Sequence, residues 1–158
     1  MAGPPRRSPE LPVPHAVVDA GTQDDVVVPV RDGHRPVVLV VDDDDILARS
    51  LRRVLAPAGL DVVVASTLAE AHAMLARERV DVVLTDFQLP DGFGVELAEC
   101  VSAARPDLGV VVMSAAPEAV VRALGPRPGA VLAKPFAIDA LLATLGGALQ
   151  PYWSTRRR

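Results

Sequence analysis

From Arg35 onward, the chain alternates short runs of β-branched and aliphatic residues with segments whose apolar residues recur at helical spacing. This alternation is typical of βαβ units, which build parallel sheets. The runs are apolar at nearly every position, as strands are when helices cover both faces of their sheet. The sequence therefore predicts a single doubly wound α/β domain with a five-stranded parallel sheet.

Five strands and five helices are expected in strict alternation with right-handed crossovers. The expected strands cover residues 37–41, 61–65, 80–85, 110–113 and 130–133. The expected helices cover residues 46–55, 67–77, 95–104, 118–124 and 138–149. Thr67 is predicted to cap the second helix, and Pro151 is predicted to end the fifth, since proline breaks the helical hydrogen-bond ladder.

The segments on either side of this domain have a different composition. Seven of the 15 prolines lie between Pro4 and Pro36, without a sustained helical or strand period, so residues 1–35 are predicted to be a disordered extension. Within it, the apolar run 26–30 fits an edge strand or, in the favoured interpretation, a linker. The domain is expected to span residues 36–149, and residues 150–158 to form a basic C-terminal tail.

Charge and cysteine content narrow the class of function. The net charge of −4, with one dense basic run at residues 156–158, argues against direct nucleic-acid binding. The single cysteine, Cys100, cannot form an internal disulfide, and no apolar run approaches the roughly 20 residues that a membrane span needs. The first residues lack the apolar region of a secretory signal, so a cytoplasmic protein is expected.

Polar residues follow four of the five expected strands directly. Asp42, Asp43, Asp44 and Asp45 follow the first strand, Asp86 the third, Ser114 the fourth and Lys134 the fifth. Parallel strands end at one edge of the sheet, and doubly wound folds bind their ligands beyond that edge. These side chains are therefore expected to form one site.

The residue types indicate phosphoryl chemistry. Converging carboxylates repel one another, and a hard divalent cation such as Mg²⁺ relieves the repulsion. A carboxylate held beside Mg²⁺ can attack phosphorus and form an acyl phosphate, whose oxygens then need a cation and a hydroxyl or backbone donor. Lys134 and Ser114 are suited to these roles. Lys134 is also the only lysine among 16 basic residues, which suggests that a compact point charge is required there.

Each of these residues also has an ordinary structural interpretation. Aspartates before a helix commonly cap it and interact with the positive end of its dipole, which would explain Asp42 to Asp45 without any metal. Asp86 and Ser114, taken singly, fit loop and turn positions. The joint placement of all four features at successive strand ends is what favours a site.

Four segments resemble the receiver domains of bacterial two-component response regulators, over residues 36–149. They are VVLVVDDDD with the following SLRRVLAPAG, VVLTDFQLPDGFGVEL, VVVMSAA and AVLAKPF, in the order and at the spacing of that family. The resemblance implies a flavodoxin-like sheet with strand order 2-1-3-4-5.

The resemblance also implies a role for each site residue. Asp86 would be the phosphoacceptor, Ser114 would bond a phosphoryl oxygen, and Lys134 would pair with the phosphoryl group. The peptide bond from Lys134 to Pro135 would be cis. The loop after the acceptor would be shaped by Pro90, Asp91, Gly92 and Gly94. The implied Mg²⁺ ligands are Asp42 (mostly through water), Asp43, Asp86 and the backbone carbonyl of Gln88.

The function implied is that of a response regulator receiver, which assists its own Mg²⁺-dependent phosphorylation and dephosphorylation and is not an enzyme acting on other substrates. A stand-alone regulator is expected, because the residues after Leu149 are too few for a DNA-binding or enzymatic domain. The phosphodonor would be a sensor histidine kinase or a histidine phosphotransfer protein. Output would pass through contacts with a downstream protein, and a homodimer is possible. Direct nucleic-acid binding and a membrane span are not expected.

Three features depart from the family pattern. Val131 replaces the aromatic switch residue three positions before the lysine, and the segment 114–134 is short and rich in proline, which predicts a reduced fourth helix. Ala115 and Ala116 follow Ser114, so no polar side chain there orients an attacking water. The sequence therefore predicts a long-lived aspartyl phosphate, unless Gln88 positions the water.

Two other functions fit part of the pattern. A receiver-shaped interaction module that works without phosphorylation would be consistent with Val131 and a reduced fourth helix. A phosphatase of the haloacid-dehalogenase type would use Asp42 and Asp44, which have the required spacing, but Ile46 replaces the hydroxyl residue expected next and the chain has no room for a cap insertion.

Overall fold

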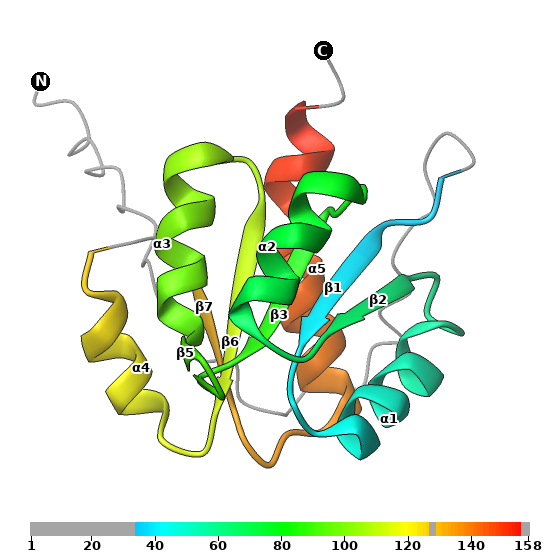
Figure 1. The fold of residues 1–158 in the computed structure, drawn as a ribbon. Helices are drawn as coiled ribbons and strands as arrows, with labels where there is room; N and C mark the ends of the chain where they lie inside the picture. The colour runs from blue at the N-terminus through cyan, green and yellow to red at the C-terminus, as the bar shows by residue number, and fades with distance from the viewer. Residues whose placement is uncertain (1–33, 127–128, 156–158) are drawn as a thin grey trace, which may run out of the picture.

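The computed structural model describes residues 34–126 and 129–155, and their side chains as far as Leu149. Its centre is a five-stranded parallel sheet covered by helices on both faces (Figure 1). The strands follow the order β2-β1-β3-β6-β7, which confirms the predicted flavodoxin-like arrangement. Their bounds are β1 Val37–Val41, β2 Asp61–Ala65, β3 Val82–Asp86, β6 Gly109–Ser114 and β7 Ala130–Ala133.

The helices divide between the two faces of the sheet. Alternate residues of β1 show the division, because Val38 and Val40 belong to one apolar core and Leu39 and Val41 to the other. The first core includes residues of α1 (Asp45–Leu55) and α5 (Ile138–Thr155). The second includes residues of α2 (Leu68–Arg77), α3 (Gly94–Ala104) and α4 (Pro117–Leu124). Burial of the strands on both faces explains their continuous apolar runs.

Two local predictions were wrong. The fifth helix does not end at Pro151 but continues to Thr155, and so includes part of the segment expected to be a tail. Proline lacks one backbone donor, yet its fixed φ is compatible with a helix, so it need not terminate one. The third strand begins at Val82 and not at Val80. The backbone N–H of Asp81 donates to the carbonyl of Val37 at 2.9 Å, but the N–H of Val37 donates to the Asp81 side chain at 2.8 Å, so the regular pairing of β1 with β3 starts at Val38 and Val82.

A short antiparallel hairpin after β3 was not predicted. It consists of β4 (Gln88–Leu89) and β5 (Gly92–Phe93), paired through Gln88 with Phe93 and Leu89 with Gly92. Two-residue strands have too few residues for a periodic pattern. The predicted extension at residues 1–35 and the run 26–30 lie outside the described residues, apart from the last two positions of the extension. None of the described helices is long and apolar enough to cross a membrane.

Candidate functional site

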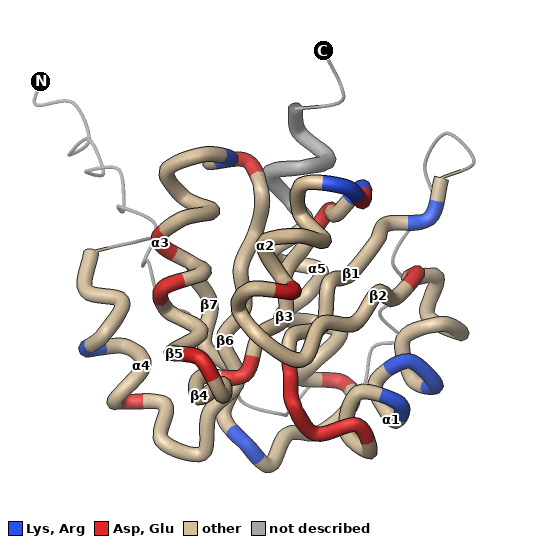
Figure 2. The backbone as a smooth tube through the Cα atoms, viewed as in Figure 1, with Lys and Arg blue, Asp and Glu red and all other residues tan. Residues whose placement is uncertain are grey.

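The site lies where the carboxyl ends of the central strands meet. Registered pairs join Val41 to Thr85, Asp86 to Met113 and Ser114 to Ala133, so the residues that follow β1, β3, β6 and β7 lie along one edge of the sheet. Figure 2 shows the acidic segments after β1 and β3 at this same edge. The placement predicted from parallel strand geometry is therefore observed.

Three carboxylates converge at this edge. One oxygen from each of Asp42, Asp43 and Asp86 lies within 4.8 Å of the others. Asp42 is 1% exposed, whereas Asp43 is exposed and Asp86 is partly buried. Burial raises the pKa of Asp42; its hydrogen bond from the backbone of Asp44 opposes this shift, and the neighbouring charge of Asp86 adds to it. The ionised form of Asp42 is thus held in an unfavourable environment.

The oxygens of Asp42 are unequally satisfied. Oδ1 accepts a hydrogen bond from the backbone N–H of Asp44 at 2.9 Å, but the buried Oδ2 has no hydrogen-bond partner in the described part of the chain. Its nearest cation, Lys134 Nζ, is 3.7 Å away, beyond hydrogen-bond distance. An unpaired buried carboxylate oxygen is costly, and a hard cation with oxygen ligands would satisfy it. Asp42, Asp43 and Asp86 therefore fit a Mg²⁺ site.

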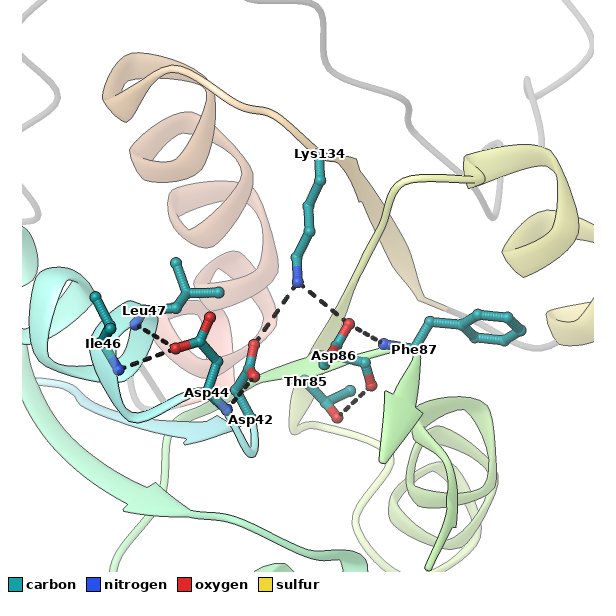
Figure 3. Close-up of polar contacts among 8 residues, drawn as sticks. All are labelled: Asp42, Asp44, Ile46, Leu47, Thr85, Asp86, Phe87 and Lys134. Carbon is teal, nitrogen blue, oxygen red and sulfur yellow. Dashed lines mark hydrogen bonds and ion pairs between the residues drawn. The ribbon is translucent and has the colours of Figure 1, made fainter. Parts of the chain in front are cut away.

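The side chain of Lys134 extends toward Asp42 and Asp86 (Figure 3). Its Nζ lies 3.3 Å from Asp86 Oδ1, and this amine therefore contacts both Asp86 and Asp42. The peptide bond between Lys134 and Pro135 is cis, as the family resemblance implied. The backbone N–H of Lys134 donates to the carbonyl of Ser114 at 2.8 Å, which fixes the start of this loop against the end of β6.

Asp86 is held by the backbone around it. Its Oδ1 accepts a hydrogen bond from the N–H of Phe87 at 2.9 Å, and its carbonyl accepts one from Thr85 Oγ1 at 2.9 Å. Gly94 packs so closely on that carbonyl that a Cβ at this position would clash with it. A glycine is therefore required at position 94 to let α3 begin directly beside the acidic cluster.

The four consecutive aspartates have different roles. Asp42 and Asp43 belong to the acidic cluster, whereas Asp44 Oδ1 accepts from the N–H groups of Ile46 and Leu47 at 3.0 and 3.2 Å and caps α1 (Figure 3). Asp45 is exposed in the first turn of that helix. Because Asp44 is used as a cap, a catalytic pair of Asp42 and Asp44, as in haloacid-dehalogenase phosphatases, is not formed.

Ser114 is buried at the end of β6, and its hydroxyl oxygen accepts a hydrogen bond from the N–H of Ala116 at 2.9 Å. Ala115 and Ala116 are exposed and bring no polar side chain to the site. Val131 is completely buried within the core below α3 and α4. Gln88 lies two residues beyond Asp86, in β4, with its side chain exposed.

One structural role near the site was not predicted. Both carboxylate oxygens of Asp91, at the turn between β4 and β5, bind backbone N–H groups at the start of α2. The residues involved are more than 20 positions apart, so no local sequence pattern indicates this contact. The Gly after Asp91, Gly92, has φ +154° and indicates only that the chain turns there.

Comparison with known proteins identifies the family of this chain. The family model described as "Response regulator receiver domain" matches residues 38–146. The response regulator MprA of Mycobacterium leprae is 36% identical over 115 residues, which are 72% of this chain and 50% of MprA. The chain thus spans about half the length of that relative.

Two solved structures show the same fold in receiver domains. A CheY-like response regulator receiver protein of Methanospirillum hungatei is 28% identical, with a TM-score of 0.69 over 77% of this chain and 99% of the other. The beryllofluoride-activated NtrC4 receiver domain dimer is 32% identical, with a TM-score of 0.66 over 73% and 98%. This chain belongs to the response regulator receiver domain family, and its class is therefore that of two-component signalling proteins.

Proposed function

We propose that this receiver domain accepts a phosphoryl group on Asp86 in a two-component phosphorelay. The observation that carries the proposal is the convergence of Asp42, Asp43 and Asp86 within 4.8 Å, with Lys134 Nζ 3.3 Å from Asp86. A carboxylate oxygen of Asp86 would form a bond to phosphorus while the donor's bond to phosphorus breaks, and the donor leaves with that electron pair.

The surrounding residues would manage charge during this transfer. Mg²⁺ would be held by Asp42, Asp43, Asp86 and the backbone carbonyl of Gln88. When bound, the ion would neutralise the charge of the carboxylates and of the oxygens of the transferring group. Lys134 would move its interaction from the Asp86 carboxylate to a phosphoryl oxygen, as its position between two acids allows. Ser114 would donate its hydroxyl hydrogen to another phosphoryl oxygen, since its observed bond from Ala116 uses the hydroxyl only as an acceptor.

The donor would be a phosphohistidine in a sensor kinase or a histidine phosphotransfer protein, and the output would pass through protein contacts of the receiver. The beryllofluoride activation of the NtrC4 receiver domain dimer supports phosphorylation as the activating event, and a homodimer as the activated form. The stand-alone arrangement expected from the sequence stays a prediction.

Labelling with radioactive acetyl phosphate or a kinase tests this function. Wild type should incorporate acid-stable label only with Mg²⁺ present, Asp86→Asn should incorporate none, and Lys134→Ala should be strongly slowed. Ser50→Ala, an exposed position on α1, is a matched control that should label like wild type. Label that persists in Asp86→Asn would refute the assignment of the acceptor.

A second candidate is a receiver-like interaction module that works without phosphorylation. It is favoured by Val131, which is fully buried and provides no side chain that could swing between the core and the surface, and by an α4 of only eight residues. A phosphodonor that leaves the mass, melting temperature and partner binding of the wild type unchanged would support this module over the phosphoacceptor.

A further inference from the structure

The first turn of α2 is bound by a side chain from the loop that follows Asp86. The two carboxylate oxygens of Asp91 accept hydrogen bonds from the backbone N–H of Leu68 at 2.8 Å and of Ala69 at 3.0 Å. These donors lie in the first helical turn, where no intrahelical acceptor is available. The two bonds lower the pKa of the exposed Asp91 carboxyl, so it is ionised at neutral pH and the bonds are charge-assisted.

The other end of this loop is attached to the acidic cluster. Phe87 donates its N–H to Asp86 Oδ1 and to the carbonyl of Met113, both at 2.9 Å, and Gly94 donates to the carbonyl of Phe87 at 2.7 Å. At the end of the β4–β5 hairpin, Glu96 Oε2 accepts from the N–H of Phe93 at 2.7 Å. The base of the hairpin is thus held by β6 and α3, while its tip is held by Asp91 against α2.

We propose that Asp91 is a positioning residue for the metal site. By holding the tip of the hairpin on α2, it would limit the movement of β4, the strand that carries Gln88, whose backbone carbonyl would be a ligand of the ion. Mg²⁺ tolerates little deviation from octahedral geometry, so a loop that moves freely binds it less tightly. This inference rests on the proposed function, because the role of Gln88 as a ligand is part of that function.

A purely structural role for Asp91 makes a different prediction. If Asp91 served only to cap α2, its loss would resemble the loss of any other cap on the same helix end. Thr67 is that other cap, since its Oγ1 accepts from the N–H of Glu70 at 3.1 Å. Both positions stabilise the start of α2, but of the two only Asp91 lies in the hairpin.

The experiment compares Asp91→Ala, Asp91→Asn and Thr67→Ala in the full chain. Mg²⁺ affinity is measured by titration calorimetry, and the melting temperature is measured in a chelator. Asp91→Ala should weaken Mg²⁺ binding about 10-fold, as loss of an outer-shell partner commonly does. Asp91→Asn keeps one acceptor oxygen and should lie between Asp91→Ala and wild type. Thr67→Ala should lower the melting temperature by about as much as Asp91→Ala does, because both remove a cap of α2. Its Mg²⁺ affinity should stay within about twofold of wild type.

A second measurement separates metal binding from chemistry. Acetyl phosphate labelling of Asp91→Ala should be slow at limiting Mg²⁺ and approach the wild-type rate at saturating Mg²⁺. Unchanged Mg²⁺ affinity in Asp91→Ala, or an equal loss in Thr67→Ala, would overturn the positioning role and leave the proposed function intact. A wild type that binds no Mg²⁺ would instead overturn both together.

Discussion

The acidic cluster predicts that removing one of its charges stabilises the metal-free protein. Asp42→Asn is the sharpest case, because Asp42 is buried, Oδ2 has no hydrogen-bond partner among the described residues, and an amide can still accept the bond from Asp44 through its oxygen. The substitution removes two repulsions, with Asp43 and Asp86 at no more than 4.8 Å, and one attraction to Lys134 at 3.7 Å.

The net effect of these three charges can be worked out from their distances. For an effective dielectric constant between about 80 and about 20, each repulsion costs at least about 0.9 to 3.5 kcal/mol and the attraction contributes about 1.1 to 4.5 kcal/mol. The net repulsion relieved is therefore about 0.6 to 2.5 kcal/mol. Removing a buried charge adds to this in the same direction. For a domain of this size, the melting temperature should rise by about 2 to 10 °C.

Thermal unfolding followed by circular dichroism, in a chelator and in saturating Mg²⁺, measures both parts of the prediction. In the chelator Asp42→Asn should melt above wild type. In Mg²⁺ the wild type should gain stability because the folded state binds the metal, and Asp42→Asn should gain much less. The difference in melting temperature between the variant and wild type should therefore narrow or reverse. Asp45→Asn is the control for loss of one negative charge, because Asp45 is exposed in the first turn of α1 and outside the cluster, so its replacement should leave the melting temperature unchanged or slightly lower. An Asp42→Asn variant that melts no higher than this control in the chelator would refute the electrostatic argument.

Three further outcomes are expected. The pKa of Asp91 is lowered by its bonds to α2, so these bonds stabilise the fold fully above the ordinary pKa range of aspartate and lose their effect as the pH falls through the lowered pKa. The difference in melting temperature between wild type and Asp91→Asn should therefore shrink on acidification. A difference that stays constant with pH would contradict this role of the Asp91 charge. Gly94→Ala places a Cβ against the carbonyl of Asp86 and should lower the free energy of unfolding, measured in urea, by about 1 to 3 kcal/mol. It should also slow acetyl phosphate labelling. Wild-type values for both measurements would show that the backbone moves to accept the extra Cβ. Ala116→Glu should shorten the lifetime of the aspartyl phosphate by about 10-fold or more, since a carboxylate at this exposed position can orient water, and equal lifetimes would disprove a role for Ala116 in slow hydrolysis.

The alternation of apolar runs and helical segments in the sequence was sufficient to predict the sheet and the edge at which the site lies, and the family resemblance implied the strand order. Apolar runs of four to six residues specify buried parallel strands, and parallel strands bring their carboxyl ends together whatever the details of packing. The sequence alone therefore places Asp42, Asp43 and Asp86 beside Ser114 and Lys134. Thr67 was likewise predicted as a cap from its position before a helical segment, and its side chain binds the N–H of Glu70.

The tertiary structure decided which of several equivalent residues does what. The sequence presents Asp42, Asp43, Asp44 and Asp45 as four identical side chains, and the turn from β1 into α1 directs two of them into the cluster and one onto the helix end. The bonds from Asp91 to α2 join residues 22 and 23 positions apart and depend on how the hairpin lies against that helix. Such contacts follow from the direction of individual side chains after packing, which no periodicity along the chain encodes.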